Sequence, residues 1–117
     1  MTLGQKIRSL RKKENLNLRE LGKLVNTDFT YLSKIENDKT DGRAPSEKLI
    51  RRLAEVLKAD ENELLSLAAR IPTELKNNIT SNPEAIGFFR NLSGKLSSED
   101  WKVLKEKAEE LSKKKER

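Results

Sequence analysis

The side chains best suited to binding chemistry gather in the stretch "FTYLSKIEN", residues 29–37. In a helix, Leu32 and Ile35 would share one apolar face. The hydrogen-bonding side chains would then lie together on the outer side: Thr30, Ser33, Lys34 and Asn37. Hydroxyl, amide and ammonium groups arranged in this way bind a partner through hydrogen bonds. The stretch therefore indicates a recognition surface.

The composition removes most catalytic and metal-binding chemistry. The 117 residues include no cysteine and no histidine, which excludes disulfides, thiolate nucleophiles, imidazole bases and the usual zinc ligand sets. Two carboxylate pairs, Glu99 with Asp100 and Glu109 with Glu110, lie in charged helical segments and are interpreted as solvated surface. We therefore predict a protein that is not an enzyme and has no catalytic residue, metal or cofactor.

The charge balance favours a polyanionic partner. Lysine and arginine number 25 against 19 aspartate and glutamate, a net charge of +6, and the excess is larger within residues 1–72 than beyond them. No apolar run approaches the roughly 18 residues of a membrane span, and the N-terminus lacks the pattern of a signal peptide. The sequence predicts a cytoplasmic protein without a membrane segment.

Helical patterns account for nearly the whole chain. The first helix contains Leu3, Ile7 and Leu10 at helical spacing. The next four begin at side chains that cap a helix well: Asn17, Asp28, Ser46 and Asp60. These five helices end near Arg70.

The second and third helices are expected to form an angled pair. The second buries Leu21, Leu24 and Val25, and Asn26 can take the left-handed conformation that ends it. Because so few residues separate the two helices, they cannot lie antiparallel and must meet at a steep angle. This geometry holds one face of the third helix on the core and leaves the other free.

Beyond Pro72 the pattern changes. A weaker helical segment starts at Thr73, a second follows Asn82, and Ser97 or Ser98 caps a last helix. That helix carries one apolar stripe: Trp101, Leu104, Ala108 and Leu111. The stripe either enlarges the core or contacts another chain.

Four stretches in this order and spacing carry a family resemblance: "IRSLRKKENLN", "RELGKLV", "YLSKIEN" and "PSEKLIRRLAEVL". Residues 3–69 resemble the Cro and phage-repressor-like family of helix-turn-helix proteins, also called the xenobiotic-response-element (XRE) family. The resemblance implies an all-α fold, with a five-helix DNA-binding domain over residues 1–71. Residues 72–117 would form a helical extension, expected to serve dimerisation or partner binding.

The resemblance also implies a function. The chain would be a sequence-specific regulator of transcription, a repressor that reads an inverted-repeat operator in double-stranded DNA with its third helix in the major groove. The expected base contacts are Phe29, Thr30, Ser33 and Lys34. The expected phosphate contacts are Arg19, Tyr31, Asn37, Lys39, Thr40 and Arg43. Arg11 and Glu36 would form an ion pair within the scaffold.

Alternatives remain for several of these residues. Phe29 could close the core between the second and third helices, and Tyr31 could pack only on the scaffold. The residues after the third helix could form a plain solvated turn. Leu18 stands where the family often carries a glutamine that contacts phosphate, and the neighbouring Arg19 could serve in its place.

Partners follow from the same resemblance. One short helix spans few base pairs, so a homodimer with its reading helices about 34 Å apart is expected. Similar tailed regulators occur beside toxins or regulatory metallopeptidases. The alternatives to a repressor are therefore an antitoxin and a helical adaptor that does not bind DNA.

Overall fold

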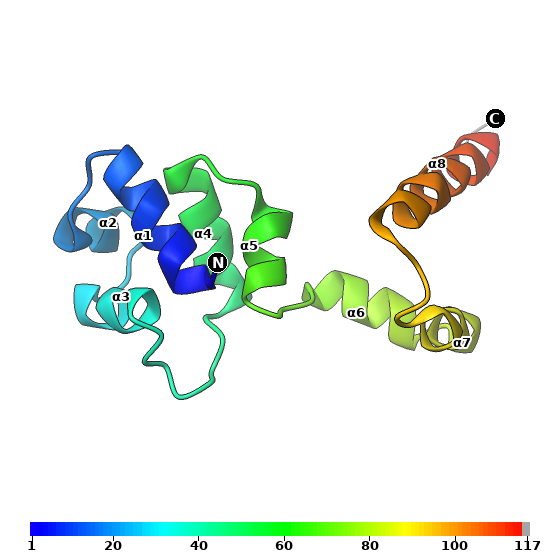
Figure 1. Cartoon of the computed structure of the whole chain (residues 1–117), viewed down its shortest axis with the longest axis horizontal. Coiled ribbons are helices and arrows are strands. Elements are labelled where there is room, and N and C mark those ends of the chain that lie inside the picture. Colours follow the sequence, from blue (N-terminus) through cyan, green and yellow to red (C-terminus); the bar gives the residue numbers. More distant parts are fainter. Residues whose placement is uncertain (116–117) are drawn as a thin grey trace. The chain divides into compact units, whose positions relative to one another are not determined.

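The computed structural model describes residues 1–115, and the regular structure within them is entirely helical (Figure 1). This confirms the predicted all-α class. In chain order the helices are α1 (Leu3–Lys13), α2 (Leu18–Leu24), α3 (Phe29–Glu36), α4 (Glu47–Leu57), α5 (Glu61–Leu67), α6 (Thr73–Thr80), α7 (Pro83–Leu92) and α8 (Ser98–Lys115). No helix among the described residues is long and apolar enough to cross a membrane.

Local side-chain caps set the helix starts. At α2, the Asn17 side chain accepts a hydrogen bond from the Glu20 backbone at 2.8 Å, and the Glu20 carboxylate accepts one from the Asn17 backbone at 3.1 Å. Such caps satisfy backbone N–H groups that have no partner inside the helix. The caps of the later helices were also predicted: Asp28, Ser46, Asp60 and Asn82. Of the two candidates for the last helix, Ser97 and Ser98, Ser97 accepts a hydrogen bond from the Asp100 backbone at 3.1 Å.

Residues Met1–Leu75 form a compact unit around one core. Helix α1 contacts α3 and α4, α2 contacts α3, and α4 contacts α5 (Figure 1). All five helices contribute fully buried side chains, which include Ile7, Leu21, Leu32, Ile50, Leu53, Leu57 and Leu64. The predicted five-helix arrangement of this part of the chain is thereby confirmed.

One predicted core residue is exposed. Leu24 was expected on the buried face of α2, but 57% of its surface is accessible. The buried side of α2 runs through Leu21, Gly22 and Val25 instead. The following turn crosses α2 at Gly22, so backbone fills the space there and Leu24 falls outside the stripe.

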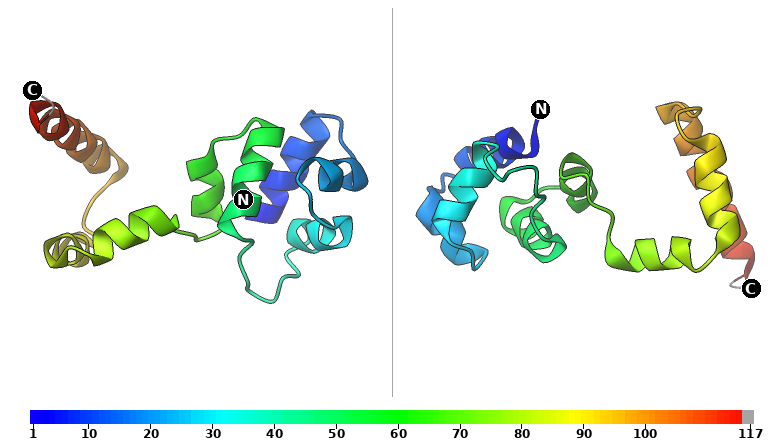
Figure 2. Two further views of the ribbon diagram at one scale, coloured as in Figure 1. Left: turned by 180° about the vertical axis from the view of Figure 1, so that it is seen from behind. Right: turned by 90° about the horizontal axis from the view of Figure 1, so that it is seen from below.

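Residues 37–46 connect α3 to α4 in a loop that extends away from the helices (Figure 1; Figure 2, left view). The loop starts near the N-terminus of the chain, since the Thr2 hydroxyl donates a hydrogen bond to the Asp38 carboxylate at 3.1 Å. At its far end, the Arg70 guanidinium donates to the carbonyl oxygen of Pro45 at 2.6 Å. Both ends of the loop are thus fixed to the five-helix unit.

The first turn of α6 is held against α4. The Glu47 carboxylate accepts hydrogen bonds from the Thr73 backbone at 3.1 Å and from the Thr73 hydroxyl at 3.0 Å. Arg51 pairs with Glu47 and Glu61 at 2.8 Å and with Glu74 at 3.1 Å. Glu47 in the first turn of α4 and Glu74 in the first turn of α6 also lie at the positive ends of their helix dipoles, which stabilises each helix start.

A second compact unit begins at Lys76. None of the described side chains of α6, α7 and α8 is buried. Within the unit, the Phe89 ring stacks on Trp101 with 6.3 Å between ring centres and 20° between planes, and Phe88 meets Phe89 edge-on at 5.3 Å. The apolar stripe predicted on α8 is therefore accessible.

Candidate nucleic-acid interface

The turn between α2 and α3 fixes how α3 leaves the core. Asn26 has φ of 54°, the left-handed conformation predicted for it. The Thr27 backbone donates to the Gly22 carbonyl at 2.8 Å, and a Cβ on Gly22 would lie only 2.7 Å from the Thr27 oxygen. Asp28 then caps α3 by accepting from the Thr30 backbone at 2.8 Å. Close backbone packing, which only glycine permits here, sets the angle of the pair.

Helix α3 presents one anchored and one accessible face. Leu32 and Ile35 are buried in the core. On the other side Thr30 and Lys34 are exposed and Ser33 is half-buried. The row of polar side chains predicted from "FTYLSK" is thus available to a partner.

Five predicted contact residues line one cleft between α3 and the loop after it, which we call the α3–loop cleft. Its volume is about 380 Å³, and its lining consists of Tyr31, Lys34, Lys39, Thr40, Asp41 and Arg43. Three of these side chains are cationic and Asp41 is the one acidic member. An ammonium, a guanidinium, a phenol and a hydroxyl that face one space can hold an anion such as a phosphate.

A second cleft, of about 390 Å³, lies on the α2–α3 turn and is lined by residues that include Arg19, Gly22, Lys23 and Phe29. The guanidinium of Arg19 lies over the Phe29 ring, 4.6 Å from its centre. Phe29 remains 39% exposed, so it does not close the core between α2 and α3. The pair places a cation beside an apolar ring at the start of α3.

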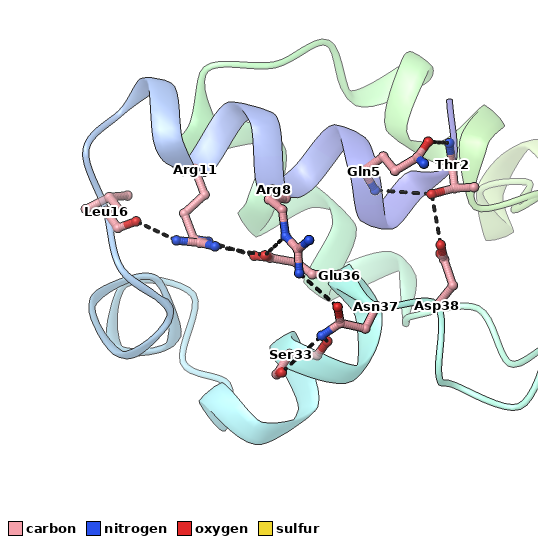
Figure 3. Close-up of polar contacts among 9 residues, drawn as sticks. All are labelled: Thr2, Gln5, Arg8, Arg11, Leu16, Ser33, Glu36, Asn37 and Asp38. Carbon is pink, nitrogen blue, oxygen red and sulfur yellow. Dashed lines mark hydrogen bonds and ion pairs between the residues drawn. The ribbon is translucent and has the colours of Figure 1, made fainter.

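A buried carboxylate joins α1 to α3 (Figure 3). Glu36 is 3% exposed and accepts two hydrogen bonds from Arg11, at 2.7 and 2.9 Å. Arg11 also donates to the Leu16 carbonyl at 2.9 Å. The hydrogen bond with Glu36 raises the pKa of Arg11 above its ordinary value. Both oxygens of the buried Glu36 carboxylate therefore have a hydrogen-bond partner on α1.

Arg8 extends this network to the outer face, a role that the sequence reading did not assign. Its guanidinium donates to Glu36 at 3.2 Å and to the Asn37 side-chain oxygen at 2.8 Å. The Asn37 amide in turn donates to the Ser33 carbonyl at 2.8 Å (Figure 3). The spacing of Arg8 and Arg11 could have indicated this role, because two residues that are three apart share one side of α1.

The predicted residues therefore fall into three groups. Tyr31, Lys34, Lys39, Thr40 and Arg43 share the α3–loop cleft, and Arg19 and Phe29 share the second cleft. Asn37 and Ser33 belong to the network of Arg8, while Thr30 lies exposed near the start of α3. Within residues 1–115, no group of acidic residues is arranged to hold a metal ion.

Comparison with known proteins agrees with this geometry. A family model described as a helix-turn-helix domain matches residues 4–70. The crystal structure of SinR, a master regulator for biofilm formation, in complex with DNA is 30% identical over 55% of this chain and 98% of that one, with a TM-score of 0.50.

A structure of the SinR–SinI protein complex is similar over 99% of this chain and 100% of that one, at 22% identity and a TM-score of 0.51. At that identity the likeness concerns the fold. No curated protein shows a significant match.

Proposed function

The chain belongs to the helix-turn-helix family of XRE-type regulators, and on that premise we propose that it is a sequence-specific repressor that reads an inverted-repeat operator in the cytoplasm. Its family and fold are those of DNA-binding regulators of transcription. The proposal adds the mode of reading and the direction of control. Helix α3 enters the major groove, and the loop after it follows the phosphate backbone.

The observation that carries the proposal is the α3–loop cleft. It places Lys34, in the last turn of the reading helix, beside the loop cations Lys39 and Arg43. A helix that reads base edges needs phosphate contacts on the same side to fix its register on the duplex. The net charge of +6 also supports the proposal, because a positively charged protein attracts the DNA polyanion over a distance.

Base reading is assigned to the side chains at the start and outer face of α3. Lys34 can donate to guanine O6 and N7, and Thr30 can bond a base or touch a thymine methyl. Phe29 and Ser33 complete the reading set. The phosphate set is Arg19, Tyr31, Asn37, Lys39, Thr40 and Arg43.

Two protomers read the operator together. One short α3 covers few base pairs, and two copies about 34 Å apart would meet successive turns of the same DNA face. Residues 72–117 are the proposed module for dimerisation or for binding a partner. The mass of the full chain in solution, compared with that of a chain ending at Arg70, tests this role. Equal monomeric masses at high concentration would remove the dimerisation role.

An antitoxin is the second candidate, favoured by the exposed apolar side chains of α7 and α8. Such a protein reads an operator in the same way and holds a toxin with its extension; a regulatory metallopeptidase is a further partner of this kind. SinR, the similar protein, has been solved with SinI. An adaptor that does not bind DNA would use the same extension but leave α3 unused.

Selection of bound duplexes from a random pool tests the proposed reading. Recovery of inverted repeats, with binding that weakens steeply as salt rises, is the expected result. Failure to enrich any sequence would favour the adaptor. Control of a reporter gene placed behind the recovered operator then distinguishes a repressor from an activator.

A further inference from the structure

Arg8 of α1 connects the buried centre of the five-helix unit with the exposed end of α3. Its Nε donates to the Glu36 carboxylate at 3.2 Å, and one of its terminal nitrogens donates to the Asn37 side-chain oxygen at 2.8 Å (Figure 3). Glu36 is buried, whereas Asn37 is exposed. The guanidinium therefore reaches from the core to a residue that the proposed function places on DNA.

The Glu36 carboxylate gives Arg8 a fixed point of attachment. Arg11 donates two hydrogen bonds to this carboxylate, at 2.7 and 2.9 Å, so Arg8 is not needed to hold it in place. Because a guanidinium is a rigid planar fork, binding of Nε also sets the direction of the other donors. The donor that meets Asn37 is thus fixed in both position and direction.

The neighbours of Asn37 permit one orientation of its amide. The amide oxygen accepts from Arg8, and the amide nitrogen donates to the Ser33 carbonyl at 2.8 Å. If the amide were turned over, its nitrogen would face the guanidinium, donor against donor, and its oxygen would face the carbonyl, acceptor against acceptor. Arg8 and Ser33 together therefore select the orientation in which the oxygen is covered.

This orientation suits contact with a phosphate. An asparagine amide carries two N–H groups, and one of those on Asn37 is directed at the Ser33 carbonyl. The Ser33 hydroxyl oxygen lies 3.4 Å from the same nitrogen, which is long for a hydrogen bond. The second N–H can therefore donate to a phosphate oxygen, whereas an amide that turned its oxygen outward would repel it.

We propose that Arg8 is a positioning residue for DNA recognition, which holds the Asn37 amide so that an N–H faces the phosphate backbone. This role rests on the proposed phosphate contact of Asn37. It adds a residue of α1, outside the helix-turn-helix pair, on which that contact depends. Because Arg8 acts through Asn37, its removal should cost little once Asn37 has been removed.

A double-mutant cycle with the full chain and the enriched duplex tests this dependence. Arg8→Met and Asn37→Ala should each weaken binding about tenfold for each protomer that makes the contact, the loss expected for one hydrogen bond to a charged group. The double variant should bind about as well as Asn37→Ala alone. Base preference should not change, since a phosphate contact carries no sequence information.

Two further variants separate orientation from charge. Lys6→Met also removes a positive charge from α1, but Lys6 pairs with Glu63 of α5 at 3.1 Å, so its effect should simply add to that of Asn37→Ala. Arg8→Lys keeps the charge without the planar fork and should lose nearly as much affinity as Arg8→Met. Circular dichroism confirms that each variant keeps its helices.

The orientation of Asn37 can also be followed without DNA. In an isotope-labelled chain, NMR resolves the two side-chain amide protons of Asn37, which are assigned by their loss in Asn37→Ala. Arg8→Met and Arg8→Lys should shift both signals and speed their exchange with water, because the amide is then free to rotate. Lys6→Met should leave both signals unchanged.

Three results would overturn the role of Arg8 while operator binding stands. The first is additive losses in the cycle, which would mean that Arg8 acts independently of Asn37. The second is full affinity in Arg8→Lys, because positive charge alone would then suffice. The third is an unchanged Asn37 amide signal in Arg8→Met. If the unaltered chain binds no duplex, the proposed function itself fails, and the role of Arg8 in recognition fails with it.

Discussion

The guanidinium carbon of Arg19 lies 4.6 Å from the centre of the Phe29 ring, which joins the first turn of α2 to the first residue of α3. A planar cation stacked on a ring loses less conformational freedom when it meets a phosphate than an unsupported side chain does. We therefore expect Phe29 to affect DNA binding in two ways. It would reach a base itself, as proposed, and it would hold Arg19 in place.

This relationship predicts energetic coupling between the two residues. Phe29→Leu and Arg19→Ala should each weaken operator binding. The double variant should lose less binding free energy than the two single variants lose together, by about 0.5–1 kcal/mol, the strength of such a stack. Titration of the four proteins with one duplex measures the coupling. Strict additivity would show that Phe29 does not position Arg19.

Lys34 and Arg43 line the same cleft but should act differently. Lys34→Ala should cost roughly 1–3 kcal/mol on the preferred site and relax the preference at one base position in each half-site. Arg43→Ala should weaken binding to all DNA sequences alike. It should also reduce the slope of log affinity against log salt concentration by about one for each protomer that makes the contact.

Binding to preferred and scrambled duplexes at several salt concentrations separates these effects. Affinity at one concentration cannot, because either change removes a positive charge. If both variants lose affinity uniformly, and no other substitution on α3 alters base preference, then α3 is not the reading surface.

Removal of Arg11 should destabilise the five-helix unit. Arg11→Met would leave the buried Glu36 with Arg8 alone, and the free energy of unfolding should fall by about 3 kcal/mol. Lys58→Met is the matched control, because Lys58 pairs with Glu14 at 3.7 Å on the surface and should matter by less than about 1 kcal/mol. Urea denaturation followed by circular dichroism gives both values. Equal losses would contradict the structural role of the buried pair.

Two glycines within helices should respond oppositely to alanine. At Gly22 an added methyl would press on the Thr27 carbonyl, and we expect a loss of about 1–3 kcal/mol with weaker operator binding. At Gly87 of α7 nothing lies within 4 Å of the added Cβ. Gly87→Ala should raise helicity and stabilise α7 by up to about 1 kcal/mol. Thermal melts compare the two, and tolerance of alanine at Gly22 would disprove the close approach of turn and helix.

The start of α6 should be sensitive to acid. The Thr73 backbone hydrogen bond, more than any other contact, lowers the pKa of Glu47 below the ordinary glutamate value of 4.5. A lowered carboxylate pKa means that the contact is complete above pH 4.5 and is lost as the pH falls through the folded value. The Thr73 amide proton shift, measured by NMR between neutral and acidic pH, should follow this titration. In Glu47→Gln it should stay constant, and a midpoint at or above 4.5 would contradict the pairing.

Features set by neighbours in sequence could be predicted well. The capping pair Asn17 and Glu20 and the left-handed Asn26 depend on side chains a few residues apart. Leu24 was misplaced because helical spacing alone does not reveal that backbone, at Gly22, fills part of the buried side of α2.

Contacts between distant residues were harder to predict. The bond from Arg8 to Asn37 joins residues 29 positions apart, and no local pattern encodes it. The family resemblance supplied Arg11 and Glu36 but not Arg8. The stripe through Trp101 and Leu111 has the periodicity of a core helix, and only the structure distinguishes a buried stripe from an exposed one.

The division between buried and accessible apolar side chains also bears on how such a protein can evolve. Among residues 1–115, every buried apolar side chain lies between Leu3 and Leu65. Sequence changes beyond Lys76 therefore leave the interior of the DNA-binding unit unaltered, and selection can act on the two parts separately. Recombination that replaced α7 and α8 with another extension would connect the same operator to a new signal in one step.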